Sequence, residues 1–418
     1  MKGQMKMPKR ISALLLCFSL VFCLVTALTG CGSTSTDLMR GFSPAAVDTP
    51  ADPDMTAAAD FSLRLFRECA DENRNTLLSP VSVLCALAMT ANGARGDTLA
   101  QMEEIFGVSS GELNRCLHAY IFSLPEGEKY KLSLANSIWF RDSGDLSVQE
   151  SFLQTNADYY EAGIFKAPLD DSTVREMNDW VNDKTDGMIN RILDSIDPGT
   201  EMYLLNALSF DAEWRSVYKE SQVRDGVFTA QDGSEQTAAF MHSIEYEYLE
   251  DDSASGFVKY YADGKYAFAA LLPNEGVSIG DYINELTGEH LAEVFDSAQN
   301  FEVDAAIPKF DTEYGVLLND ILYSMGMTDA FDAASADFSG IGVSGKGRLY
   351  IGQVVHKTHI TVDEKGTKAG AVTMVSAPAS APMPVETKTV HLDRPFVYMI
   401  IDCETFLPVF IGTLMTTA

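Results

Sequence analysis

The sequence is poor in basic residues for its length. Lysine and arginine total 30 against 60 aspartates and glutamates, so the formal net charge is −30. Nucleic acids and heparin-like polymers require a basic surface that neutralises their own charge. The charge balance therefore argues against both kinds of partner and indicates a soluble, acidic globular domain.

The sequence also lacks clustered cysteines. It has seven, of which Cys17, Cys23 and Cys31 belong to an N-terminal apolar stretch. The others are widely scattered and show no CxxC spacing: Cys69, Cys85, Cys116 and Cys403. We expect neither a zinc or redox motif nor a structural disulfide.

Motifs for catalysis and for cofactors are missing as well. The nearest approach to a Gly-x-Ser-x-Gly elbow is "GVSGKG" from Gly342, which has Lys346 in place of the second glycine. His356 and His359 are three residues apart in a strand-like run, so their side chains point to opposite faces. The remaining histidines are isolated in the sequence: His118, His242, His290 and His391. We expect no catalytic site, no metal and no cofactor.

The N-terminus has the pattern of a secretion signal. Basic residues precede an apolar run over residues 11–28, which ends in Leu-Thr-Gly-Cys at Cys31. This ending is similar to a bacterial lipobox, in which the cysteine is lipidated. A plain signal peptide or a membrane anchor helix are the alternatives. We expect a signal at residues 1–30 and a flexible, acylated tether at 31–54, rich in Ser, Thr, Pro and Asp.

Helical periodicity dominates the first part of the body. It predicts helices over residues 57–69, 81–92 and 98–106. Gly93 and Gly107 stand where glycines that end helices are expected.

Strand-like runs follow, and the last third is almost entirely of this kind. The clearest are "KLSLANSIWF", "MYLLNALSF", "YAFAALLP", "FEVDAAIPKF", "VVHKTHITVD", "FVYMIID" and "VFIGTLM". Helices and strands without strict alternation indicate an α+β fold.

One late stretch, residues 362–384, reads partly as a loop and partly as a strand. From Thr367 to Ala377 every second residue is small or β-branched and uncharged, as one buried face of a strand requires. No proline lies between Lys365 and Ala377, so every backbone N–H there could join a sheet. Prolines then follow at 378, 382 and 384. The stretch can therefore become a strand that ends near Pro378.

Several runs, in order from Met55 to Thr416, together resemble the serpin family. They include "NTLLSPVSVLCALAMTANGARGDTLAQMEEIFG", "MNDWVNDKTDGMI", "YLLNALSFDAEW", "IPKFDTEYGVLLNDILYSMGMTDAFDAASADFSGI", "VVHKTHITVDEKGTKAGAVT", "DRPFVYMIID" and "LPVFIGTL". The resemblance implies a serpin domain over residues 55–418, with many helices, three β-sheets and an exposed reactive-centre loop at about 364–392.

The resemblance also implies a mechanism. A serine protease cleaves the loop and forms an acyl-enzyme, and the loop then inserts into the central sheet and distorts the protease. Such a protein is a suicide-substrate inhibitor and not an enzyme. The inhibitory hinge pattern is matched by Glu364, Gly366, Thr367, Ala369, Ala371 and Thr373. A non-inhibitory serpin, acting as a binding protein or as a plain protease substrate, is the alternative.

Two further groups of residues carry over from the family. Ser82, Asn206 and His356 fall on the shutter, the latch beneath the central sheet. Trp214 and Lys309 fall on the breach at the top of this sheet, where Lys309 would pair with Glu364.

The position of the scissile bond depends on how the loop is counted. Counting from Glu364 gives Ser380–Ala381, whereas counting back from Pro395 gives Pro384–Val385. Bonds followed by proline fit most serine proteases badly, which leaves Ala379–Ser380 and Ser380–Ala381. Their small side chains suit elastase-like or subtilisin-like proteases and not trypsin-like ones. We expect a monomer on the extracellular face of a bacterial membrane, attached only through the N-terminal lipid.

Overall fold

The structure, a computed structural model, describes residues 34–124, 127, 129–142, 144–160, 162–345, 347–367 and 386–417. The N-terminal signal and Cys31 lie outside these residues. The helices and strands below belong to a single unit, Ser35–Ala418. Within the described residues, no helix is both long enough and apolar enough to span a membrane.

Nine α-helices lie within the described part of the chain, and the three predicted helices are among them. Their bounds are α2 (Thr56–Cys69), α3 (Pro80–Ala91), α4 (Gly96–Phe106), α5 (Ser110–Phe122), α6 (Glu150–Tyr159), α7 (Asp171–Lys184), α8 (Ile279–Glu285), α9 (Gly288–Asp296) and α10 (Asn319–Ser324). Short 3-10 turns lie at Glu220–Gln222 and Asp329–Phe331.

The two glycines expected to end helices behave differently. Gly107 ends α4 with a φ of 73°, the left-handed conformation that glycine adopts without strain. Asn92, not Gly93, is the C-cap of α3. Gly93 is instead required by packing, since a Cβ there would lie 2.1 Å from Cγ1 of Ile341.

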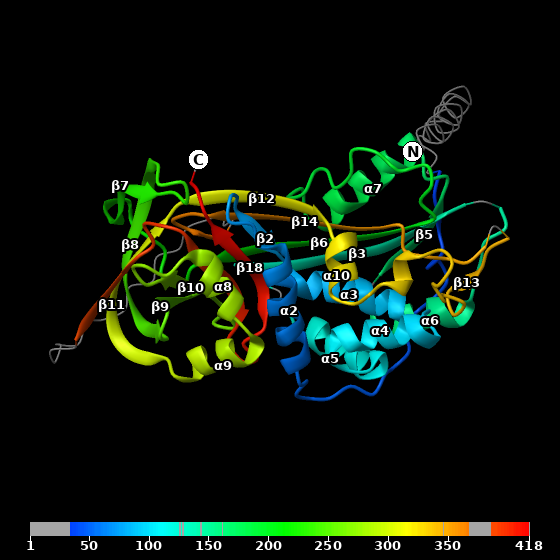
Figure 1. The fold of residues 1–418 in the computed structure, drawn as a ribbon, viewed down its shortest axis with the longest axis horizontal. Coiled ribbons are helices and arrows are strands. Elements are labelled where there is room, and N and C mark those ends of the chain that lie inside the picture. Colours follow the sequence, from blue (N-terminus) through cyan, green and yellow to red (C-terminus); the bar gives the residue numbers. More distant parts are fainter. Residues whose placement is uncertain are drawn as a thin grey trace, which may run out of the picture. The chain divides into compact units, whose positions relative to one another are not determined.

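The first sheet has seven strands and includes the last strand before the loop. Its order is β1 (Thr36–Asp37), β5 (Gly163–Ala167), β3 (Tyr130–Arg141), β6 (Met202–Glu213), β15 (Gly366–Thr367), β14 (Gln353–Val362) and β12 (Phe310–Leu317). Figure 1 shows β12, β14, β6 and β3 running side by side, with α7 over one face and α3–α6 over the other.

The second sheet has nine strands. Its order is β16 (Thr387–His391), β11 (Gln299–Pro308), β8 (Glu235–Glu250), β9 (Ala254–Tyr260), β10 (Tyr266–Pro273), β17 (Phe396–Asp402), β18 (Pro408–Leu414) and β2 (Thr76–Leu78), with β7 (Val223–Thr229) paired to β8. A third sheet joins β13 (Gly342–Val343) to β4 (Ser147–Val148). The predicted α+β fold with three sheets is confirmed.

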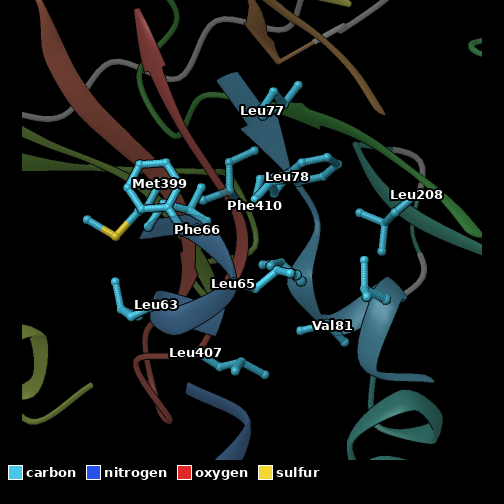
Figure 2. Close-up of a cluster of buried hydrophobic side chains, with 14 of the residues drawn as sticks. Leu63, Leu65, Phe66, Leu77, Leu78, Val81, Leu208, Met399, Leu407 and Phe410 are labelled. Atoms are coloured by element: carbon cyan, nitrogen blue, oxygen red, sulfur yellow. The ribbon is translucent and has the colours of Figure 1, made fainter. Parts of the chain in front are cut away.

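The hydrophobic core is divided by the seven-stranded sheet. The larger cluster holds α2, α3 and the nine-stranded sheet, and Figure 2 shows Phe66, Leu78 and Phe410 close together in it, with Leu208 to one side. The smaller cluster lies on the α7 side and includes Met177, with Leu205 from the other face of β6. Alternate residues of β6 thus face different cores, as the pleat of a strand requires.

The segment expected to be a flexible tether is packed from Ser35 onward. Thr36 and Asp37 pair with β5, and the N–H of Leu38 donates to the Ile164 carbonyl at 2.8 Å. Leu38, Met39 and Phe42 lie against the larger core cluster. The compact unit therefore begins earlier than the boundary expected at Met55, because apolar side chains in this segment bind the body.

Candidate functional site

The strand β15 lies between β6 and β14 at one end of the seven-stranded sheet. Gly366 and Thr367 pair with Glu213 and Ala212 of β6, and Thr367 also pairs with Val362 of β14. The chain reaches this position through a tight turn after β14, in which the Asp363 N–H donates to the Gly366 carbonyl at 3.0 Å.

Below β15, the two flanking strands pair directly with each other. The parallel ladder runs from Gln353↔Tyr203 to Thr358↔Leu208. The sheet is therefore open at one end, where it holds the two residues of β15, and closed along the remainder. A longer strand could enter only if this ladder separated.

Glycine is required at the first position of β15. A Cβ on Gly366 would lie 2.0 Å from the carbonyl oxygen of Ala212. The side chain of Thr367 is fully buried, and its Oγ1 lies 2.6 Å from the hydroxyl of Tyr261. Both residues were predicted as hinge residues. Ala369, Ala371 and Thr373 lie outside the described residues, as do Ala379, Ser380 and Ala381.

The turn before β15 is held by Trp214, a residue predicted for the breach, and by Tyr218. Trp214 donates two hydrogen bonds to this turn. Its backbone N–H donates to the Lys365 carbonyl and its indole Nε1–H to the Asp363 carbonyl, both at 2.8 Å. Tyr218 donates its backbone N–H to the Glu364 carbonyl at 2.9 Å. The backbone of the turn is thus fixed before the loop begins.

Lys309 and Glu364 form the ion pair expected at the breach. Their Nζ and Oε2 atoms lie 2.6 Å apart, and the side chains are 36% and 40% exposed. The ammonium of Lys309 holds the pKa of the Glu364 carboxyl below its usual range. Because both groups reach solvent, the pair contributes modestly to stability.

A row of polar residues crosses the middle of the same sheet. Asn136 of β3 lies opposite Asn206 of β6, which in turn lies opposite His356 of β14. Ser82 on α3 approaches this row from below, with its Oγ 3.4 Å from the Asn136 carboxamide. The three residues predicted for the shutter are therefore in one cluster, joined by Asn136, which the sequence did not indicate.

His356 is neutral in this cluster. It is fully buried, and burial lowers its pKa to about 3. The Ser79 N–H donates to Nε2 at 3.0 Å, so Nε2 accepts and Nδ1 carries the proton. Nδ1–H then donates to Oδ1 of Asn206, whose amide nitrogen donates to the Val355 carbonyl at 3.2 Å. Every polar atom of the pair is satisfied, which a buried polar group requires.

The chain matches the family model described as serpin (serine protease inhibitor) over residues 56–417. It is a serpin. The roles of hinge and shutter, which the resemblance implies for β15 and for the buried polar row, remain predictions within this family.

Relatives and solved structures support the assignment. The native state of tengpin, a thermophilic serpin, superposes with a TM-score of 0.88 at 48% identity, covering 92% of this chain and all of that one. A serpin-like protein of Thermococcus kodakarensis is 32% identical over 87% of this chain and 85% of its own length. A leukocyte elastase inhibitor of Xenopus tropicalis is 28% identical, over 82% and 94%.

The sequence analysis did not predict a buried lysine beside Trp214 and Tyr218 in this serpin. Lys259 on β9 is 2% exposed, and its Nζ lies 2.7 Å from Oε1 of Glu245. The same ammonium lies 4.4 Å from the ring centre of Tyr218 and 5.4 Å from that of Trp214. Burial alone would lower the pKa of Lys259, but Tyr218 and Glu245 raise it, so the lysine stays charged. The single lysine inside the apolar run "GFVKYY" could have indicated a buried, paired charge.

Proposed function

We propose that this serpin inhibits serine proteases by inserting its cleaved loop between β6 and β14. The observation that carries the proposal is that Gly366 and Thr367 already occupy a strand position between these two strands. Insertion would then extend an existing strand, so no new strand pairing has to be initiated.

The pairing of Thr367 fixes which side of the inserted strand would face each core. Thr367 lies opposite Ala212 and Val362, both in the larger core cluster. Continued in this register, the residues that face the larger cluster are Ala369, Ala371, Thr373, Val375 and Ala377. All are small or β-branched, so they fit beneath packed strands without displacing bulky groups.

The registers of β15 with β6 and with β14 place the same loop residue at the predicted shutter. Counted along β6, Thr373 would lie opposite Asn206, and counted along β14 it would lie opposite His356. Insertion would thus separate Asn206 from His356 and place a threonine hydroxyl between their polar atoms. The buried polar row would then have a function: its hydrogen bonds stabilise the paired strands β6 and β14 until the inserted loop replaces them.

We infer elastase-like or subtilisin-like proteases as targets. The candidate scissile bonds, Ser380–Ala381 and Ala379–Ser380, present small side chains that suit a small specificity pocket. The relative named as a leukocyte elastase inhibitor supports this class of target. We further propose that Cys31 is lipidated, which would anchor the inhibitor at the extracellular face of a bacterial membrane.

The alternative is a non-inhibitory serpin that binds a ligand or is simply cut. It would share the scaffold and differ in the hinge. A soluble form that starts at Gly32 keeps the whole compact unit and is suitable for the test. It is incubated with an elastase and with a subtilisin, then analysed on denaturing gels with mass spectrometry of the released peptide.

We expect a covalent complex that survives denaturation, together with a peptide that begins at Ala381 or Ser380. Cleavage without a complex would contradict inhibition and support the alternative. The variant Thr367→Arg, in which we expect the loop not to insert, serves as the control.

A further inference from the structure

Two histidines that are isolated in the sequence meet an aspartate on the nine-stranded sheet. His242 lies on β8, Asp304 on β11 and His391 on β16, three neighbouring strands. Sheet pairing brings together segments that are far apart in the chain, so these residues lie close to one another in the fold. Figure 1 shows β8 and β11 next to each other at one end of the molecule.

The register of the sheet explains how the three side chains converge. Ala306 of β11 lies opposite His242 on one side and opposite His391 on the other. Asp304 is two residues away on the same strand, so it shares a face with Ala306. The methyl group of Ala306 is too small to fill the space above it, which lets the two imidazoles lean across β11.

The donor atoms have the spacing that a metal ion requires. The nearest nitrogen or oxygen atoms of His242, Asp304 and His391 all lie within 4.8 Å of one another. Nε2 of His391 and Oδ2 of Asp304 are 3.4 Å apart. Ligand atoms each about 2.0–2.2 Å from a tetrahedral zinc ion are separated by about 3.3 Å. Small rotations of the side chains would bring all three into position.

One of these atoms has no hydrogen-bond partner among the residues that the structure describes. Nε2 of His391 is shielded from solvent and lies 3.4 Å from Oδ2 of Asp304, but the two atoms do not have the geometry of a hydrogen bond. The side chains of His391 and Asp304 as a whole are 37% and 45% exposed, so an ion and its water ligands could enter. A buried ring nitrogen without a partner is costly in a purely structural pair, and a bound cation would satisfy it.

We propose that His242, Asp304 and His391 bind a divalent transition-metal ion of the zinc class, with water in the open coordination position. Two imidazoles and one carboxylate suit zinc, copper or nickel better than magnesium or calcium, which prefer oxygen ligands. Arg224 on β7 lies near His242 and opposes the cation, whereas the net charge of −30 favours it.

The bound ion would fasten the strand that follows the reactive-centre loop. β16 is an edge strand, and among the described strands it pairs only with β11. Its ladder runs from Glu302↔Thr387 to Ala306↔His391. An ion held by His391 and His242 would connect this edge strand to β8 across β11, and so hold the C-terminal end of the loop. This proposal does not depend on whether the serpin traps proteases.

The test is zinc titration calorimetry on the full chain in mild detergent, without a polyhistidine tag and after removal of metals. His242→Gln, His391→Gln and Asp304→Asn each remove one ligand. Ala306→Leu keeps all three and fills the space between them. His359→Gln is the matched control, since it removes a histidine paired with one carboxylate, Asp311, on the other sheet. Circular dichroism verifies that each variant is folded.

We expect the parent and His359→Gln to bind one more equivalent of zinc than the four site variants, or to bind it at least about tenfold more tightly. Magnesium should not compete. Equal zinc binding by the parent and by folded His242→Gln and His391→Gln would overturn the site.

Hydrogen exchange gives a second, independent readout. Opening of β16 would destroy the site, so at free zinc 100 times the Kd the amides of residues 387–391 should exchange about 100-fold more slowly. His391→Gln should show no such protection. Unchanged exchange in the parent at saturating zinc would overturn the fastening of β16.

Discussion

Thr367 and Tyr261 connect the short strand β15 to the interior of the serpin. Their side-chain oxygens lie 2.6 Å apart, and both residues are fully buried. The ring of Tyr261 stacks on Trp214, with ring centres 4.6 Å apart and an interplanar angle of 12°. Thr367, a predicted hinge residue, is therefore part of the core, and we expect substitutions at this position to affect the proposed insertion directly.

If this serpin traps proteases as proposed, Thr367→Arg should turn it into a protease substrate. A guanidinium is not tolerated at a fully buried position without a partner, so the strand could not extend past this point. We expect Thr367→Arg to reduce trapping of elastase by at least about tenfold while cleavage continues. Thr387→Arg, at an exposed threonine of β16, is the control. Normal trapping by Thr367→Arg would contradict the proposed path of insertion.

Reversal of the charge at Glu364 should weaken inhibition. Glu364→Lys would place two ammonium groups together where Lys309 and Glu364 are now 2.6 Å apart. Because an exposed ion pair contributes at most about 1 kcal/mol, we expect the association rate with elastase to fall by about fivefold. The double variant Lys309→Glu with Glu364→Lys should recover most of the rate. Identical rates in all three proteins would mean that the pair plays no part in insertion.

Stability should fall below pH 6.5 because of His356. Its pKa in the folded state is about 3, below the ordinary value near 6.5, so the unfolded chain binds the proton more readily. The stabilising contribution is complete above pH 6.5 and is lost as the pH falls toward 3. Between pH 7.5 and 5.0 this loss amounts to about 2 kcal/mol.

Urea unfolding of the parent and of His356→Gln at the two pH values measures this contribution. The variant should be less stable overall but less dependent on pH by about 2 kcal/mol. His359→Gln, which changes the half-buried histidine on the same strand, should keep the pH dependence of the parent. An equal dependence in His356→Gln would show that other groups cause it.

Arginine at Ser380 should extend inhibition to trypsin. If Ser380–Ala381 is the scissile bond, Ser380→Arg presents a basic side chain to the acidic pocket at the correct distance from the hinge. We expect a trypsin complex that survives denaturation with Ser380→Arg, and cleavage without a stable complex with Ala379→Arg. The opposite result would move the bond to Ala379–Ser380.

Local patterns in the sequence determined much of the fold. The helices near Thr56, Pro80 and Gly96 and the long strands followed from apolar periods, because one side of each element is buried. The hinge stays a prediction from the sequence, based on the alternating small residues and the absence of proline that strand formation by a loop demands. The shutter and breach residues came from the family resemblance, and the structure brought Ser82, Asn206 and His356 together as implied.

Sheet pairing decided what the sequence could not. The position of Gly366 and Thr367 between β6 and β14, the part played by Tyr261 and the meeting of His242 with His391 all depend on register between distant segments. A strand's own alternation states which residues share a face, but not which strand lies beside it or at what offset. Hydrogen-bond ladders formed on folding fix those offsets, and so they decide which side chains meet.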